Sequence, residues 1–353
     1  MTIIVAVLIF GVLILVHEYG HYIAAVKNGI VVEEFAIGMG PVLYSKKRGD
    51  TLFSLRAVPV GGFCKMLGMD GEEDSEDQNA YNNKSVPARI MVISAGSIMN
   101  FILSFVLVLV LLSFNGLSNT TINMVEPGGP AYTAGILPGD RVTVIDGRNV
   151  WIFQDISFAL INNGERPVDV TVNRQGETFT FGMTPQREGG QYRIGIGSDR
   201  YAGFLAFGAE GTRAGVVETI TSSYWQIVHF VRIVIFSLGE LFSANAGLDD
   251  IAGPVGIVNI IGGAVQTAQT ISLWAMVTQV MTLAALLSAN LAVLNLLPFP
   301  ALDGGRLVFL FIEGIRGKPV SPQKEGLVHA AGFILLMGLI LLVTFNDISQ
   351  FFR

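Results

Sequence analysis

Apolar residues gather into long runs along the chain. The runs lie near the N-terminus, around 90–114, around 271–297 and around 326–345. A helix needs about 20 apolar residues to cross a hydrocarbon core, and each run is long enough. The pattern therefore predicts four transmembrane helices. The first run, 2–26, lacks a basic start and a small-residue cleavage site, so we expect a retained helix and not a signal peptide.

Between the second and third runs the sequence changes to that of a soluble domain. Short alternating segments at 168–172 and 178–181 predict strands, and 153–162 has the spacing of a helix. Pro-Gly pairs and other turn residues separate these segments. The chain is thus expected to be a polytopic α-helical membrane protein with one inserted α/β domain, at 117–202.

Composition agrees with this division. Only 14% of the residues are charged and 51% are hydrophobic, against roughly 25% charged in soluble domains. A water-soluble protein is excluded. The expected partners are the lipid bilayer and membrane proteins, with no nucleic acid. The single cysteine, Cys64, rules out an intrachain disulfide and a cysteine-based zinc cluster.

Positive charge is distributed unevenly, and this indicates the orientation. Every lysine lies within 27–89 or 304–325, and the inserted domain contains none. Lysine and arginine near membrane spans favour the cytoplasmic side. We expect these two segments in the cytoplasm and the inserted domain outside it.

The first run contains a zinc-binding motif. His17, Glu18 and His21 form an H-E-x-x-H sequence, and positions i and i+4 share one face of a helix, so both imidazoles can reach one metal ion. Glu18 can take a proton from water that the metal activates. Ionisable groups inside an apolar helix are functional by default. The alternative is a histidine pair near the lipid headgroups without metal.

A third ligand is needed, and Asp303 is the best candidate. Pro298 and Pro300 end a regular helix just before it, and Gly304 and Gly305 permit a tight turn after it. Such irregular backbone at membrane depth is tolerated where it is buried in protein or lines a polar cavity. The alternative is that Asp303 only caps the following helix.

The remaining ambiguous stretch is 217–242, which is apolar with scattered polar residues. For His17 and Asp303 to meet one zinc ion, the first and third runs must cross the membrane in the same direction. An even number of crossings must then separate them, so we expect 217–242 to be an amphipathic helix on the outer surface. His229 in this stretch is expected to be an interfacial residue, and His329 an unremarkable residue at a membrane boundary.

At this point the sequence resembles the site-2 protease family of intramembrane zinc metalloproteases, in its bacterial branch with one inserted PDZ domain. The resemblance covers nearly the whole chain. The family carries H-E-x-x-H in its first helix and N-x-x-P-x-P-x-L-D-G in its third, the latter matched here by Asn295, Pro298, Pro300, Leu302, Asp303 and Gly304.

This resemblance implies roles for the motif residues. His17, His21 and Asp303 are expected to hold Zn²⁺ and Glu18 to act as the general base. Asn295 is expected to hold the substrate backbone or the developing oxyanion. In the second helix the family usually has Gly-Pro-x-x-Asn where this chain has Gly96-Ser97-Ile98-Met99-Asn100. The missing proline implies a weaker local kink.

Two further segments carry the resemblance. Residues 35–41 and 61–66 look like the family's membrane-associated β-hairpin region, which implies that Gly38, Gly40, Gly61 and Gly62 bind substrate as an added strand. Residues 130–147 resemble a PDZ domain of the protease-associated type. Such a domain can bind peptide ends, or it can act as a size filter.

Together these observations predict a four-part chain in a bacterial plasma membrane. Residues 1–116 hold two helices and the β-hairpin region, 117–202 the extracytoplasmic PDZ domain, 203–270 the amphipathic helix, and 271–353 the last two spans. The expected activity is cleavage of single-pass membrane proteins, such as anti-sigma factors and remnant signal peptides. Two alternatives are a membrane-anchored peptidase facing the cytosol and a PDZ scaffold with a non-catalytic metal site.

Overall fold

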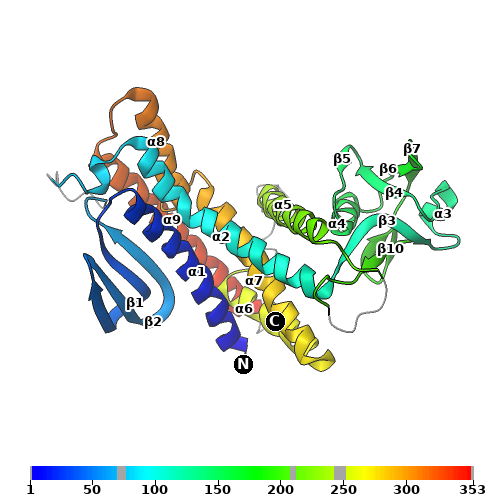
Figure 1. Cartoon of the computed structure of the whole chain (residues 1–353), viewed down its shortest axis with the longest axis horizontal. Coiled ribbons are helices and arrows are strands. Elements are labelled where there is room, and N and C mark those ends of the chain that lie inside the picture. The colour runs from blue at the N-terminus through cyan, green and yellow to red at the C-terminus, as the bar shows by residue number, and fades with distance from the viewer. Residues whose placement is uncertain (1, 70–76, 207–211, 242–251, 351–353) are drawn as a thin grey trace. The chain divides into compact units, whose positions relative to one another are not determined.

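Four helices of the computed structural model are long and apolar enough to cross a membrane, among the residues that the structure describes. They are α1 (Thr2–Lys27), α2 (Val86–Asn115), α7 (Leu273–Leu296) and α9 (Pro322–Gln350) (Figure 1). They confirm the four predicted runs. The described residues are 2–69, 77–206, 212–241 and 252–350. The chain divides into two compact units, Val108–His229 and the rest.

Within the larger unit, two additional helices accompany the four spans. α6 (Pro254–Ile271) packs against α1, where Ile261 and Val265 are buried with Ile9 and Leu13. α8 (Asp303–Arg316) follows α7 after a short irregular stretch. Sequence periodicity did not predict α6. Its apolar face becomes apparent only where it meets α1.

A small sheet lies against α1 in the same unit. It is built from two long strands, β1 (Val32–Arg48) and β2 (Thr51–Met66). Residues 34–37 of β1 pair with 62–65 on one side and with 52–55 on the other. The segment 62–66 is therefore an outer edge, and no other strand among the described residues pairs with it.

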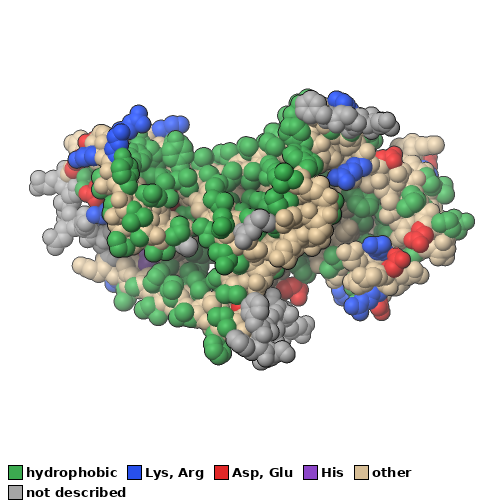
Figure 2. Space-filling view, turned by 90° about the horizontal axis from the view of Figure 1, so that it is seen from below, with side chains coloured by type: hydrophobic (Ala, Val, Ile, Leu, Met, Phe, Trp, Pro, Cys, Tyr) green, Lys and Arg blue, Asp and Glu red, His purple; other side chains and the backbone are tan. Residues whose placement is uncertain are grey.

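The surface of the larger unit fits a lipid environment. Hydrophobic side chains cover the helices on the face drawn in Figure 2, and Lys and Arg gather at the end that carries α8 and the β1–β2 sheet. Isolated exposed apolar residues are normal on soluble proteins, but a continuous apolar face of this kind is typical of a membrane or binding surface.

The second unit is an α/β domain with a five-strand path. The strand order is β10-β3-β4-β6-β7, with β5 beside β4 and a separate β8–β9 pair. Its buried core is formed mainly by valine and isoleucine, from the strands and from α4. The predicted helix and the two predicted strands are present. The elements are β3 (Leu117–Val125), α3 (Pro130–Ala134), β4 (Arg141–Ile145), β5 (Arg148–Asn149), α4 (Phe153–Asn163), β6 (Val168–Arg174), β7 (Glu177–Met183), β8 (Gln186–Glu188), β9 (Gln191–Arg193) and β10 (Ile196–Tyr201).

The ambiguous stretch forms α5 (Val216–Leu241), which is not among the four apolar spans. Its first half belongs to the second unit. There Trp225 stacks on Trp151 with ring centroids 4.0 Å apart, and His229 Nδ1 lies 2.8 Å from Asp155 Oδ1. The expectation of an interfacial His229 was wrong, because the carboxylate of α4 draws this side chain into a buried pair, with His229 only 5% exposed.

Candidate metal centre

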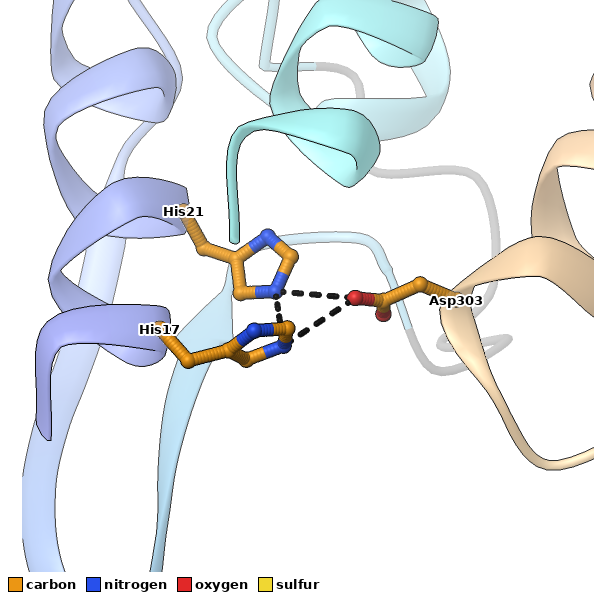
Figure 3. Close-up of side chains that lie close together, drawn as sticks. All are labelled: His17, His21 and Asp303. Carbon is orange, nitrogen blue, oxygen red and sulfur yellow. Dashed lines mark hydrogen bonds and ion pairs between the residues drawn. The ribbon is translucent and has the colours of Figure 1, made fainter. Parts of the chain in front are cut away.

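The two motif histidines lie one turn apart on α1 and face the same point. His17 and His21 are buried, and their Nε2 atoms are 3.2 Å from each other. The i, i+4 spacing places both rings on one face of the helix. Figure 3 shows both rings directed at Asp303, which comes from a separate segment. Asp303 Oδ2 lies 3.1 Å from His17 Nε2 and 3.3 Å from His21 Nε2.

Asp303 reaches this point because the chain turns sharply after α7. The helix ends at Leu296, and Asp303 is the first residue of α8. A Cβ on Gly304 would lie 2.0 Å from the Leu297 carbonyl oxygen, and one on Gly305 would lie 2.5 Å from that of Phe299. Only glycine allows this close approach, so the two glycines let the turn fold back on α7.

The three ligand atoms have the spacing that zinc requires. Zinc–nitrogen and zinc–oxygen distances of about 2.0–2.1 Å in a tetrahedral site place the ligand atoms roughly 3.3 Å apart. The three separations here are 3.1, 3.2 and 3.3 Å. These residues form the one cluster of potential metal ligands among the described residues. The donor set is therefore suited to zinc, with a fourth position left for water or substrate.

α2 packs against both imidazoles. The contacting residues, Val92, Gly96 and Asn100, are four positions apart and share one face of α2. The His21 ring donates from Nδ1 to the Val92 carbonyl oxygen at 2.9 Å, which leaves the lone pair of Nε2 facing Asp303. A Cβ on Gly96 would lie 2.4 Å from His21 Nε2 and 2.8 Å from His17 Nε2. Asn100 is fully buried, and its Nδ2 lies 3.3 Å from His17 Nδ1.

A cavity of about 580 Å³ opens onto these ligands. Glu18, the middle residue of the motif, lines it beside the two histidines. The backbone amide of Cys64 is a hydrogen-bond partner of the Glu18 carboxylate. Asn295, on the last turn of α7, lines the same cavity. The structure thus places every residue predicted for catalysis and metal binding around one space.

The four glycines predicted to bind substrate lie outside the cavity lining. Gly38, Gly40 and Gly61 all have φ between 83° and 87°, so they shape the irregular backbone of the sheet. Gly62 is the nearest to the site, since a Cβ there would lie 3.4 Å from the Glu18 Cγ. The lining from this sheet consists of the next four residues, 63–66.

Electrostatics reinforces the assignment of Asp303 as an anion. Burial by itself would raise its pKa, but the interactions with the neighbouring His17 and His21 outweigh that effect and hold the pKa of Asp303 well below its usual range. The pKa of the nearby Cys64 thiol is shifted in the opposite direction. Burial, with the Glu18 charge, raises the pKa of Cys64 to about 12, so this thiol is neutral at physiological pH.

Sequence reasoning assigned no role to the supporting residues, although Gly96 and Asn100 lie in the segment compared with the family's Gly-Pro-x-x-Asn pattern. Val92 acts through its carbonyl and Gly96 through the lack of a side chain, so neither carries a chemical signal. Asn100 did carry one, because it is an amide within an apolar helix, and polar residues there usually have a function. His329 was expected to be unremarkable, yet its Nδ1 accepts a hydrogen bond from the Ala301 amide at 3.0 Å.

The unit with the apolar helices holds two histidines, a carboxylate and a neighbouring glutamate around one cavity. This combination defines a membrane metalloprotease. Comparison with known proteins gives the family. The model of peptidase family M50 matches residues 5–339, and the chain belongs to this family. It is a zinc-dependent protease of the membrane, and its activity is intramembrane proteolysis.

Individual relatives are similar over nearly their whole length. A protein of Clostridium acetobutylicum named as a zinc metalloprotease is 38% identical, over 98% of this chain and 97% of its own. The zinc metalloprotease RasP of Shouchella clausii is 32% identical, over 99% of both chains. The regulator of sigma-W protease RasP of Bacillus subtilis is 30% identical, also over 99% of both.

Proposed function

We propose that His17, His21 and Asp303 hold the catalytic zinc ion and that Glu18 is the general base of peptide hydrolysis. The observation that carries this is the triangle of ligand atoms at tetrahedral spacing, with Glu18 on the wall of the same cavity. When bound, zinc polarises the scissile carbonyl and makes water a better nucleophile. Glu18 takes the proton of the attacking water and passes it to the leaving amine.

The substrate is proposed to dock as an extended strand on the edge formed by 62–66. This edge has a β1 partner on one side only, and its residues 63–66 line the cavity beside Glu18. An added strand satisfies unpaired backbone groups at such an edge. A helical substrate hides its carbonyls in internal hydrogen bonds, so it must unwind first. Asn295, on the same cavity wall, is placed to hold the substrate backbone or the developing oxyanion.

Substrates of this enzyme are proposed to be single-pass membrane proteins of the bacterial plasma membrane. Anti-sigma factors are one class, supported by the name of the B. subtilis relative, a regulator of sigma-W protease. Remnant signal peptides are another. The lysine-rich segments are proposed to face the cytoplasm, which leaves the inserted domain outside it.

We infer that residues 117–202 form a PDZ domain that binds extended peptide ends. Support comes from a cavity of about 360 Å³ between α4 and the β9–β10 region, with apolar residues of α4 on one wall. β10 is an end strand of the sheet path, as strand addition requires. A size filter is the alternative, and it predicts that peptides from substrate ends have no measurable affinity for the protein.

The test of the active site compares the wild type with Glu18→Gln on a single-pass substrate in liposomes. Cleavage and bound zinc are measured on the same samples. The variant is expected to keep about one zinc per chain and to lose cleavage by roughly a hundredfold or more, because proton transfer is worth at least that much. Glu188→Gln, an exposed carboxylate in β8, serves as the control and should cleave normally.

Either of two outcomes would contradict the proposal. If Glu18→Gln retains cleavage, the base is another residue. If zinc binds but the wild type cleaves no membrane substrate, the scaffold alternative is favoured. Cleavage of soluble proteins in preference to embedded ones would favour the peptidase that faces the cytosol.

A further inference from the structure

The turn that delivers Asp303 contains an alanine in an unfavourable backbone conformation. Ala301, two residues before Asp303, has φ of 78°. This is the left-handed region, which disfavours residues with a Cβ. Such a conformation persists only where surrounding contacts hold it. Because Asp303 follows so closely, relaxation of Ala301 would displace the carboxylate.

The contact that holds Ala301 comes from a different helix. His329 on α9 accepts the Ala301 backbone N–H at its Nδ1, at 3.0 Å. The imidazole itself is wedged against α8, with its ring centroid 5.6 Å from that of Phe309. Its other nitrogen faces Glu325 one turn away, at 3.9 Å, which is too long for a hydrogen bond. The ring is therefore fixed between the turn and the helix that begins at Asp303.

A second feature of α9 keeps the helix close to the turn. A Cβ on Gly332 would lie 2.3 Å from the Pro300 Cβ and 2.7 Å from the Pro300 carbonyl oxygen. Positions i and i+3 lie on one face of a helix, so Gly332 and His329 present one surface to neighbouring residues of the turn. The close approach at Gly332 is what allows the imidazole to reach the Ala301 amide.

We propose that His329 is a positioning residue, which holds Ala301 in its left-handed conformation and thereby fixes the Asp303 carboxylate for zinc binding. The histidine is not one of the three proposed ligands and does not line the cavity, so it acts through the backbone of the turn. This inference rests on the proposed role of Asp303 as a zinc ligand. Binding sites need ligands held within about half an ångström, so a turn free to relax weakens the site.

The test is a double-mutant cycle on the full-length protein in detergent, with zinc affinity measured by chelator competition. His329→Leu removes the acceptor and should weaken zinc binding roughly tenfold, the lower end of the effect of outer residues at metal sites. His329→Asn keeps an acceptor near the position of Nδ1 and should bind nearly as tightly as the wild type. Leu327→Ala, an exposed position on the same helix, is the matched control.

The second single variant of the cycle, Ala301→Gly, removes the backbone strain at position 301. Glycine adopts positive φ without penalty, so Ala301→Gly should make the turn less dependent on His329. We expect the double variant Ala301→Gly, His329→Leu to recover most of the affinity that His329→Leu loses. A Co²⁺-substituted sample reports the ligand geometry independently of activity, and its visible absorption should shift in His329→Leu and return in the double variant.

Failure of this inference and failure of the proposed metal site give different results. If Asp303→Ala keeps wild-type zinc affinity, Asp303 is not a ligand and the site assignment fails. If Asp303→Ala loses zinc but His329→Leu binds normally, the positioning role is overturned. It is overturned too if Ala301→Gly gives no recovery, since His329→Leu would then act by disturbing the packing of α9.

Discussion

Gly96 shows how a single residue without a side chain can decide whether a metal site exists. It occupies the point on α2 directly behind the Nε2 atoms of His17 and His21, where a methyl group would overlap both rings. The sequence showed the glycine, but not what it faces, because the nearest groups belong to a segment more than 70 residues earlier. The spacing of a motif shows which residues share a face of one helix, but it does not show which residues of another helix that face contacts.

Gly96→Ala is expected to abolish zinc binding. The added Cβ would lie 2.4 Å from His21 Nε2, well inside van der Waals contact, so at least one imidazole must move. Zinc content by mass spectrometry of the purified protein measures this directly. Gly11→Ala on α1, where a Cβ meets nothing within 4 Å, is the control and should bind one zinc. Full zinc occupancy in Gly96→Ala would contradict the geometry.

Asn100 is a second single residue whose side chain is expected to affect zinc binding, through the ring of His17. If His17 binds zinc through Nε2, its Nδ1 carries the proton and needs an acceptor. The Asn100 Oδ1 is buried without a hydrogen-bond partner, while its Nδ2 lies beside that nitrogen. A half-turn of the amide places Oδ1 against the Nδ1 proton and satisfies both groups.

Asn100→Leu should therefore weaken zinc affinity by about 10–100-fold, whereas Asn100→Asp, which keeps the acceptor, should stay closer to the wild type. Chelator competition separates the two. Equal losses in both variants would mean that the Asn100 side chain is required only for the packing of α2 against α7, at the point where the Asn100 backbone carbonyl accepts a hydrogen bond from Ser288.

At the scale of elements, the periodicity of apolar residues predicted whether a segment forms a helix or a strand. It did not predict which other elements that segment packs against. The four spans, α4 and the strands β6 and β7 of the inserted domain followed from apolar runs and alternation. α6 did not, because its buried face is defined by α1. The pairing of β1 with two parts of β2 was also beyond reach, since the register shifts near strand positions such as Gly38 and Gly61, whose positive φ values the sequence alone does not give.

One element of the inserted domain should be sensitive to acid. Arg174 of β6 donates two hydrogen bonds, each 2.7 Å, to Asp140, whose side chain is 1% exposed. Burial would raise the pKa of Asp140, but the bonds from Arg174 outweigh this and lower it below its ordinary value. A lowered folded-state pKa stabilises the domain above the unfolded-state pKa of about 3.9, and the stabilisation is lost as the pH falls through the folded-state value.

Hydrogen exchange of the full-length protein between pH 6 and pH 3 measures this loss, corrected for the intrinsic pH dependence of exchange. Protection of residues 117–201 should fall at the acid end in the wild type. Arg174→Met leaves the Asp140 carboxylate without its partner and should destabilise the domain at neutral pH. An Asp140→Asn variant should show a flatter pH dependence. If the wild type and Asp140→Asn lose protection with the same pH dependence, other groups cause the acid sensitivity.

At the scale of the whole molecule, the family, the metal and the reaction class were all predictable from two short motifs and the apolar runs. Orientation in the membrane is predicted from the lysine distribution and can be measured directly. In a Cys64→Ser background, Lys46→Cys in β1 and Gly189→Cys beside β8 place single thiols on exposed positions of the two units.

A membrane-impermeant maleimide should label these two thiols from opposite sides of the bilayer. In intact spheroplasts we expect labelling at position 189 only, and in inside-out vesicles at position 46 only. Labelling of both from one side would overturn the proposed placement of the inserted domain, and with it the even number of crossings between α1 and α7.

The wide separation of the metal ligands along the chain has a consequence for biosynthesis. His17 and His21 emerge from the ribosome long before Asp303, and α9, which carries His329, emerges after Asp303. During synthesis the nascent chain therefore carries two of the three proposed ligands without the third. If these three residues hold the zinc ion, the protease stays inert during its own synthesis until the segment that carries Asp303 has joined the first helix in the membrane.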